Sequence, residues 1–593
     1  MKITSQSVIE GFLRRFGGAV GQRLGHRLAT ASNAVLSHVE ADTDHRSGTE
    51  GRGAAALRVA CFSPYATWEL HSAWELTVLQ ALARRGCATS LLLCDAVAPT
   101  CDLAWADQNA PFDRCLVCQN RATGTARLLR HSFVWISRYI DAADRAAAIA
   151  WAAALPDHGL RHAHFGDADL GEWCFGSMSS HFRGPRLDLD NPEVRLTYRQ
   201  YLSGAAQTFA GCRAWLEAVQ PDVLWLFNGR MSLTRVAFEA ARGLGIRVIC
   251  HERGIVRNSL RLWENERCSQ YQNRRRIALA NAEQPLTAEQ VRQVVRWLDD
   301  RRHSRNYNRQ PFLKKRRPNA PQSLETAGVS EGDHLLVALT SSDHEFGAEP
   351  DRNQIFPEQH EWLTAVIGWA DKNVRCRVVI RFHPNASPSS WAALAERVPA
   401  LAEGDFTSAV RISANVSVIP PGNPLDTYAL LDVCRAVTTY GSTTGIEAAA
   451  AGKTVITADH CSYHGLPWTH SAESPLHFLE LLDSVSWFER VQPDPEVASG
   501  AMRFFWDYHL GQSITSRLVR HPGIDYARIN YRADVPEQLD YGKDGGLDRI
   551  TDVIMGQRPI YDRRAEGDAA AERTAVLAHL KAAGLSTRGA TST

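Results

Sequence analysis

The sequence predicts an α/β protein made of two doubly wound domains that face each other across a cleft. Short apolar strands alternate with helix-periodic segments in two stretches, 57–295 and 331–500. Such alternation is typical of parallel sheets covered by helices. A basic, proline-containing stretch at 296–330 separates the two. The length of 593 residues also exceeds one ordinary core and indicates about two to four domains.

The first domain opens with a β-α-β unit, in which helical periodicity between two strands ends at Gly86. A right-handed crossover between parallel strands follows from this order. The predicted strands cover 58–62, 88–94, 221–227 and 246–250, and a helix at 232–243 joins the last two. The loops after these strands lie at carboxyl ends, where open α/β sheets bind ligands.

The second domain repeats the alternation. Its predicted strands cover 334–339, 377–382, an edge strand near Val416, 436–440 and 454–458, and its helices cover 359–371 and 424–434. An aromatic-rich helix at 502–510 is expected to pack back across the domains, within crossover helices at 501–559. Residues 560–593 are expected to form a polar tail.

The first 56 residues combine a helix-periodic, arginine-containing segment with a linker. One interpretation is an interfacial helix on an anionic membrane. We favour the other, a helix docked on the protein body or a frayed terminus, because the polar face is poorly separated.

Composition limits the function classes. A net charge of +1 gives no global field that would favour nucleic acid. No apolar run approaches the ~20 residues that span a bilayer, and no secretory signal is evident. The thirteen cysteines do not resemble a secreted disulfide scaffold. We therefore expect a cytoplasmic protein, with peripheral contact at the inner face of the membrane as an open option.

The most informative segment is VTTYGSTTGIEAAAAGKTVI at 437–456. It predicts a buried strand, a tight turn and a short helix that Gly452 ends. Backbone N–H groups and the helix dipole at such a turn suit a phosphate. The predicted phosphate-binding residues of the turn are Gly441, Ser442, Thr443 and Thr444.

Further motifs carry a resemblance to a family. RFHPN at 381–385 and the segment 423–456 resemble bacterial capsule-polysaccharide biosynthesis proteins and related Kdo- and sialic-acid-transferase-like enzymes of the GT-B fold. LFNGR at 226–230 and HERG at 251–254 are similar to the amino-terminal half of the same group. The resemblance spans roughly 58–520 and implies two Rossmann-like domains, the second of which binds a nucleotide-sugar.

The resemblance implies that His383 meets the donor phosphate, that Ser442 and Thr443 hold it, and that Glu447 reaches the ribose. Fixed donors of this kind stabilise the negative charge that develops on a leaving nucleotide. Alternatively, His383 is a strand-end histidine that bonds to a carbonyl, and Glu447 is a solvated helix residue. Arg381 shares a face with His383 and pairs with either phosphate or a structural carboxylate.

Glycosyl transfer also needs a base near the acceptor hydroxyl. Glu252 ranks first because it follows a strand, and Asp167 ranks second; each could instead form a buried ion pair. The remaining candidates are Glu69, His71, Glu172, Asp343 and Glu345. The predicted acceptor cleft contains Asn228, Arg230, His251 and Arg253, the last as a clamp for an acidic sugar or a phosphate.

Four cysteines fall within one stretch that we expect to be rich in loops. Cys94, Cys101, Cys115 and Cys118 have the spacing C-x6-C-x13-C-x2-C. A structural zinc site is the favoured interpretation. Small buried cysteines and an iron–sulfur cluster are the alternatives.

These observations predict a glycosyltransferase that uses a nucleotide-sugar, with a CMP-linked acidic sugar as one option, to extend a glycan or lipid-linked acceptor of a surface polysaccharide. No DxD motif lies in a suitable loop, so no catalytic metal is expected. The alternatives are a nucleotide-sugar epimerase or polyol-phosphate transferase of the same fold, and a non-catalytic scaffold of polysaccharide export.

Overall fold

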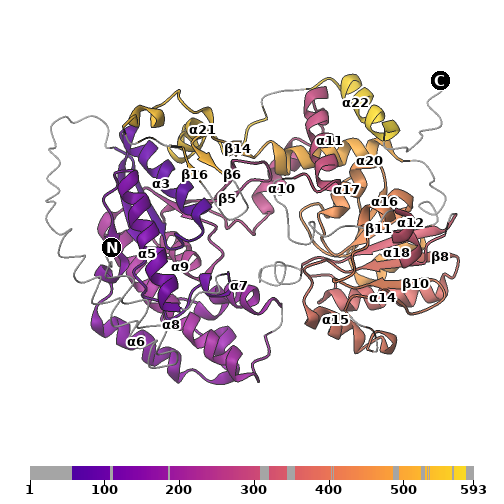
Figure 1. Ribbon diagram of the computed structural model, residues 1–593, viewed down its shortest axis with the longest axis horizontal. Coiled ribbons are helices and arrows are strands. Elements are labelled where there is room, and N and C mark those ends of the chain that lie inside the picture. The colour runs from indigo at the N-terminus through magenta and orange to yellow at the C-terminus, as the bar shows by residue number, and fades with distance from the viewer. Residues whose placement is uncertain are drawn as a thin grey trace, which may run out of the picture.

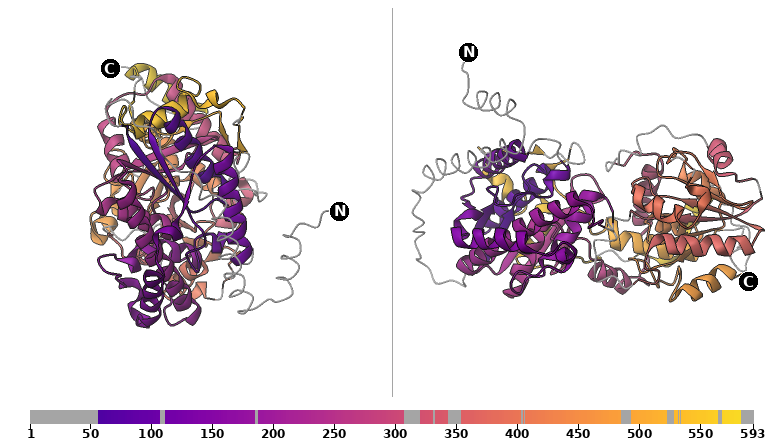
Figure 2. Two further views of the ribbon diagram at one scale, coloured as in Figure 1. Left: turned by 90° about the vertical axis from the view of Figure 1, so that its left-hand side faces the viewer. Right: turned by 90° about the horizontal axis from the view of Figure 1, so that it is seen from below.

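The computed structural model describes most of the chain from residue 56 to residue 582 (Figure 1). The described residues are 56–106, 111–184, 187–306, 320–330, 332–342, 354–402, 404, 406–484, 493–521, 528–530, 532, 534–563 and 567–582. The predicted N-terminal helix lies outside them, as do Asp343 and Glu345. Figures 1 and 2 show two lobes side by side, joined along one edge by segments from both halves of the chain.

The first lobe contains a seven-stranded sheet in the order β14-β6-β5-β4-β1-β2-β3. Its strands are β1 (Arg58–Ser63), β2 (Ala88–Leu93), β3 (Val134–Trp135), β4 (Val223–Phe227), β5 (Arg247–Arg253), β6 (Ser259–Glu264) and β14 (Ile514–Thr515). The strands β1 to β5 run parallel, and β6 and β14 are antiparallel additions. A strand from the carboxyl-terminal part of the chain therefore completes the first sheet.

Helices cover both faces of this sheet (Figure 1). They are α3 (Glu69–Arg84), α4 (Leu103–Ala106), α5 (Pro111–Leu128), α6 (Ala142–Ala154), α7 (Leu170–Phe182), α8 (Pro192–Val219) and α9 (Ser232–Gly243), with 3-10 turns η1 (Ile136–Tyr139) and η2 (Asp157–His162). The β1 and β4 strands are almost wholly buried apolar runs, as expected where helices cover both sides. The core of this lobe also takes in α21 (Gly545–Ile554), which packs against α3.

The second lobe contains another seven-stranded sheet, in the order β13-β12-β11-β7-β8-β10-β9. Its strands are β7 (His334–Leu339), β8 (Cys376–Arg381), β9 (Val410–Arg411), β10 (Val416–Ile419), β11 (Ala436–Thr439), β12 (Thr454–Thr457) and β13 (His470–Ser471). All pairings are parallel except that of β9 with β10. Because β9 lies outside β10, the predicted edge position of the strand near Val416 is wrong.

The helices of the second lobe and of the junction complete the described elements. They are α10 (Gln272–Ala280), α11 (Ala288–Arg302), α12 (Ala320–Ala327), α14 (Gln359–Lys372), α15 (Pro388–Ala395), α16 (Thr427–Val433), α17 (Thr444–Ala450), α18 (Pro475–Asp483), α20 (Pro495–Phe505) and α22 (Ala569–Ala582). The smaller elements are η4 (Pro399–Leu401), the π-helical turn η5 (Trp506–Leu510), η6 (Pro536–Leu539) and the ribbon of β15 (Val519–Arg520) and β16 (Arg528–Ile529).

Both sheets have the strand order of a dinucleotide-binding fold. In each, the order reverses beside the first strand of the lobe, between β1 and β4 and between β7 and β11. The predicted fold class, two doubly wound α/β domains as in GT-B proteins, is confirmed. Ligands of such sheets bind outside the carboxyl ends of the strands at the point of reversal. No helix among the described residues is long and apolar enough to cross a membrane.

Three local expectations are wrong. The strand predicted to end at residue 250 continues to Arg253, because the antiparallel strand β6 pairs with it. The part of the cysteine-containing stretch that holds Cys115 and Cys118 is helix α5 rather than loop, whereas Cys94 and Cys101 lie in loop. The expected polar tail contains α22, which buries Val576 and Leu580 against the second lobe and pairs Glu572 with Arg503.

Candidate functional site

Four strands of the second lobe end at the same edge of the sheet. Their parallel pairing brings the loops after β7, β8, β11 and β12 together, on both sides of the point where the strand order reverses. Three of the predicted site segments lie in these loops. The chain therefore gathers polar groups where open α/β sheets bind nucleotides.

His383 follows β8, and hydrogen bonds hold both its backbone and its ring. Its backbone N–H donates to Thr340 Oγ1 at 2.7 Å, and its ring Nδ1 accepts the backbone N–H of Asn385 at 3.1 Å. A neutral imidazole that accepts at Nδ1 carries its hydrogen on Nε2. The half-buried ring therefore carries its donor N–H on Nε2.

The GST turn offers fewer amide donors than predicted. The N–H groups of Gly441 and Ser442 donate to Thr439 Oγ1 at 3.1 and 2.8 Å, and Thr444 N–H donates to Ser442 Oγ at 3.4 Å. Gly441 has a φ of 143°, a backbone conformation that would be strained in any residue with a side chain. The backbone N–H of Thr443 has no hydrogen-bond partner in the described part of the chain. Thr443 is exposed, so its amide and hydroxyl are the groups of this turn that can reach a phosphate.

Glu447 and Arg381 lie in the predicted places but bind protein groups. The buried Glu447 carboxylate accepts from Arg301 Nε and from the Tyr428 hydroxyl, both at 2.8 Å. Both oxygens are taken, so the predicted contact with a ribose has no support in this geometry. The Arg381 guanidinium donates to the carbonyls of Pro420 and Asn423, which holds the loop after β10 and leaves the predicted phosphate contact equally without support.

Sequence reasoning missed a pair of histidines after β12. The rings of His460 and His464 lie 4.5 Å apart, and Tyr463 between them donates its hydroxyl to the Ser442 carbonyl at 2.5 Å. Arg275 of α10 reaches the same loop and donates to the Ser462 carbonyl at 3.1 Å. Burial, with His460 and Arg275 nearby, lowers the pKa of His464 to about 4. The signal was available, since two histidines flank a polar run directly after a predicted strand.

Glu252 lies at the carboxyl end of β5 in the first lobe. Its Oε2 accepts from Asn228 Nδ2 at 2.8 Å, and its Oε1 accepts from Arg253 N–H at 2.9 Å and lies 3.5 Å from His71 Nε2. Burial alone would raise the pKa of the Glu252 carboxyl, but His71, Arg253 and Asn228 together lower it. Burial lowers the pKa of His71 to about 3, so the imidazole is neutral at pH 7 beside an ionised carboxylate.

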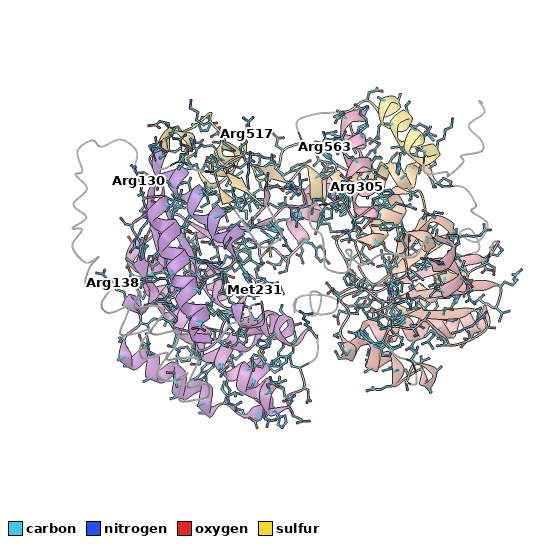
Figure 3. All side chains as sticks on the ribbon, viewed as in Figure 1. Arg130, Arg138, Met231, Arg305, Arg517 and Arg563 are labelled. Atoms are coloured by element: carbon cyan, nitrogen blue, oxygen red, sulfur yellow. The ribbon has the colours of Figure 1, made fainter. Side chains whose placement is uncertain are left out.

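The turn after β4 fixes Asn228 against this carboxylate. Asn228 has a φ of 63° and is buried, and the next residue, Gly229, has a φ of 67°. The Asn228 N–H donates to the His251 carbonyl, and its Oδ1 accepts from Arg230 N–H at 2.8 Å. Left-handed non-glycine residues held by their surroundings are concentrated at functional sites. Met231, at the end of this turn, lies on the side of the first lobe that faces the second (Figure 3).

The remaining residues of the predicted acceptor cleft differ in burial and in their partners. His251 is 0% exposed and stacks on Trp225 at 4.4 Å, so its prediction as a cleft residue is wrong. Arg230 is half-buried and donates to Ser180 Oγ at 3.3 Å. Arg253 is half-buried beside Glu252, where the clamp was expected.

Of the other candidate bases in the described part of the chain, His71 alone lies beside Glu252. Asp167 is 80% exposed and lies near Arg213 of α8 at 3.8 Å, so the structure gives it no place at this site. Glu69 pairs with Arg121, and Glu172 pairs with Arg161.

The four cysteines do not form the predicted metal arrangement. Cys115 and Cys118 lie one turn apart on α5, and Cys118 donates to the Pro64 carbonyl. Among the described residues, which include all four cysteines, no three His, Cys, Asp or Glu side chains form a group that could hold a metal ion. Burial raises the pKa of each of the four thiols. The geometry gives the zinc prediction no support.

A chain of contacts connects the two halves of the candidate site. Arg261 of β6 is the cross-strand partner of Glu252 and donates to His509 Nδ1 at 3.4 Å. Arg301, which pairs with Glu447 of the second lobe, is close enough to lower the pKa of His509. These residues therefore link Glu252 of the first lobe to Glu447 of the second through one junction.

Comparisons with known proteins show distant structural similarity. No protein-family model matches the chain, and no curated protein sequence does. It is similar to KpsC of Thermosulfurimonas dismutans, a β-Kdo 2,4 transferase, at 16% identity and a TM-score of 0.29, over 47% of this chain and 79% of that chain.

Epimerases show similarity at the same level. The UDP-GlcNAc 2-epimerase of Neisseria meningitidis is 10% identical with a TM-score of 0.29, over 76% of this chain and 97% of that chain. A putative UDP-N-acetylglucosamine 2-epimerase of Listeria monocytogenes is 11% identical with a TM-score of 0.27, over 87% and 99%. Similarity this distant does not distinguish between transfer and epimerisation.

Proposed function

We propose that the protein is a glycosyltransferase that moves a sugar from a nucleotide-sugar donor to a glycan or lipid-linked acceptor during the synthesis of a surface polysaccharide. Two observations support the proposal: the ionised carboxylate of Glu252 lies at the carboxyl end of a strand in the first lobe, and the imidazole of His383 follows a strand end in the second. Transfer needs both a base at the acceptor and a donor at the leaving nucleotide.

The second lobe binds the donor in this proposal. The imidazole of His383 and the amide and hydroxyl of Thr443 hold the phosphate, at the edge where the strand order reverses between β7 and β11. His460 and His464 border the same edge and are placed to contact the transferred sugar.

The first lobe binds the acceptor. Glu252 accepts the proton of the acceptor hydroxyl as that oxygen forms its bond to the sugar carbon. The bond from this carbon to the phosphate oxygen breaks, and His383 stabilises the resulting charge by a hydrogen bond. Asn228 positions Glu252, and the neutral His71 leaves the carboxylate its negative charge.

A donor screen tests the proposal. The purified chain is incubated with CMP-, UDP-, GDP- and CDP-sugars, with and without glycan acceptors, and nucleotide release and sugar products are measured. Acceptor-dependent release of one nucleotide is the expected result. Interconversion of the sugar without an acceptor would favour an epimerase instead.

Binding measured by thermal shift separates both enzymes from a scaffold. A ligand present at 100 times its Kd adds about 2.7 kcal/mol to the free energy of unfolding. A chain that none of these nucleotides stabilises would contradict the proposed function.

A further inference from the structure

Two arginines at the junction of the lobes lack a carboxylate partner. Arg274 of α10 is 3% exposed; its Nε donates to Gln512 at 2.8 Å, and its guanidinium lies 4.7 Å from the ring centres of both Trp263 and Tyr508. Arg261 of β6 is half-buried over Trp263. Neither forms an ion pair within the described part of the chain. Buried cations are normally paired, so this pair leaves an excess of positive charge.

Neighbouring groups respond to this charge. Burial, and then Arg261 and Arg274, lower the pKa of His509 well below its ordinary value. Burial, and then Arg261, lower the pKa of Arg274 to about 9. Nε of Arg261 and Nε2 of His509 are both buried without a hydrogen-bond partner. The junction therefore presents donors and positive charge in excess of the acceptors that the chain supplies.

The position of Arg261 relates this charge to the acceptor. Arg261 and Glu252 are direct partners in the β5–β6 ladder, so their side chains share one face of the sheet. They nevertheless form no ion pair, because Arg261 donates to His509 while Glu252 accepts from Asn228 and Arg253. The carboxylate is therefore not neutralised by Arg261, and the guanidinium keeps its charge.

We propose that Arg261 determines specificity by binding a negatively charged group of the acceptor, a carboxylate or a phosphate, next to the hydroxyl that Glu252 deprotonates. The identification of this ligand as the acceptor rests on the proposed function. Arg274, which is clamped between two rings, adds positive potential without contacting the ligand. Arginine suits this task because its planar fork matches both oxyanions.

Calorimetric titration of the full chain tests the proposal, with inorganic phosphate, glucuronate and neutral glucose as probes. We expect saturable binding of at least one of the two anions and none of glucose. Arg261→Gln should weaken that binding at least tenfold. Arg257→Gln is the control, because Arg257 is exposed and the charge change is the same; it should weaken binding less than twofold. Binding of phosphate but not of glucuronate would identify a phosphorylated acceptor. Binding of glucuronate but not of phosphate would identify an acceptor that carries an acidic sugar. Equal effects of the two variants would overturn the proposal.

Thermal unfolding without ligand excludes a packing role. Because Arg261 is a cation without a carboxylate partner, Arg261→Gln should melt at the same or a higher temperature than the unmodified chain. A lower Tm with unchanged anion affinity would overturn the proposal. If the variant does not fold, Arg261→Lys decides, since retained anion binding supports the site and its loss contradicts it.

The outcome is independent of the donor screen. Anion binding that depends on Arg261, in a chain that turns over no nucleotide-sugar, would support the site and contradict the proposed function. If the chain turns over a nucleotide-sugar but Arg261→Gln does not change its affinity for anions, the result would support the proposed function and contradict the anion site.

Discussion

Arg563 and Asp507 form an ion pair of 2.8 Å in which the two side chains are 1% and 0% exposed. Tyr561 donates to the other carboxylate oxygen at 2.6 Å, and Arg563 also donates to the Asn281 carbonyl at 2.7 Å. Asp507 belongs to the π-helical turn η5, and Arg563 lies between the lobes at their upper edge (Figure 3). One guanidinium thus joins the turn between the lobes to the end of α10.

Arg563→Met should lower the free energy of unfolding by about 3–5 kcal/mol, because it leaves a buried carboxylate without its cation. Urea unfolding measures the change. Arg573→Met is the control, since Arg573 pairs with Glu496 on the surface and its loss should change stability by less than about 1 kcal/mol. Equal changes in the free energy of unfolding would show that the buried pair contributes no more to stability than the surface pair.

His383→Ala should reduce the turnover of nucleotide-sugar by roughly 10²–10³-fold, the usual effect of removing one fixed donor to a developing charge. The Tm should stay close to that of the unmodified chain, because the ring is only half-buried and lies in a loop after β8 rather than in the core. His470→Ala, an exposed change in the same lobe, is the control. Undiminished turnover in His383→Ala would remove this residue from the mechanism.

Glu252→Gln should reduce transfer by roughly 10²–10⁴-fold, as expected for the loss of a general base. Because the pKa of Glu252 is lowered, the carboxylate accepts protons throughout neutral pH, and kcat/KM should fall only below the ordinary glutamate range. The pH dependence of kcat/KM checks this expectation. Asp167→Asn is the control, because it alters an exposed carboxylate and should leave activity intact. A strong loss with Asp167→Asn would reverse our ranking of the two bases.

Glu447→Gln should lower stability by about 2 kcal/mol, because it weakens charged hydrogen bonds to Arg301 and Tyr428. The Kd of the nucleotide should change by less than twofold, in contrast to the expectation for a ribose ligand. Asp432→Asn removes a half-exposed pair with Arg302 and serves as control. Weaker nucleotide binding without destabilisation would restore the contact predicted from the sequence.

Acid should destabilise the fold through His521, which accepts the Trp74 indole N–H at 2.9 Å. Burial, and then Arg253 and Arg257, lower its pKa from 6.5 to about 4. The unfolded chain therefore gains a proton below pH 6.5 that the folded chain does not. Stability from this group is complete above pH 6.5 and is lost as the pH falls toward 4, by roughly 3 kcal/mol.

Urea unfolding at a series of pH values checks this prediction. His521→Gln should flatten the pH dependence between 6.5 and 4, whereas the exposed control His158→Gln should leave it unchanged. An unaltered slope in His521→Gln would assign the acid sensitivity to other groups.

Strand periodicity and order were sufficient to predict the central parallel strands of both sheets and the carboxyl-end positions of His383 and Glu252, but not the short outer strands β3, β9, β13 and β14 or the antiparallel strand β6. Boundaries failed where a later strand decided them, as when β6 extended β5 as far as Arg253. The helix at α22 was missed because its apolar residues, Val576 and Leu580, are few and become buried only against distant helices.

The local sequence pattern did not predict which side chains contact each other in the fold. Glu447 looked like a ligand contact, but Arg301, 146 positions earlier in the chain, takes its carboxylate. His251 looked exposed by its place at a strand end, but the stack on Trp225 buries it. In both cases the deciding neighbour comes from another strand or helix.

The short strand β14 has a consequence for how the protein forms. It pairs with β6, and α21 packs on α3, so residues 514–554 complete a lobe that begins at residue 58. During synthesis, the first lobe must wait with an open sheet edge until the second lobe and residues 514–515 have left the ribosome. Exposed edges of this kind are prone to aggregation, so the vulnerable species in production of this protein is the nascent chain rather than the finished one.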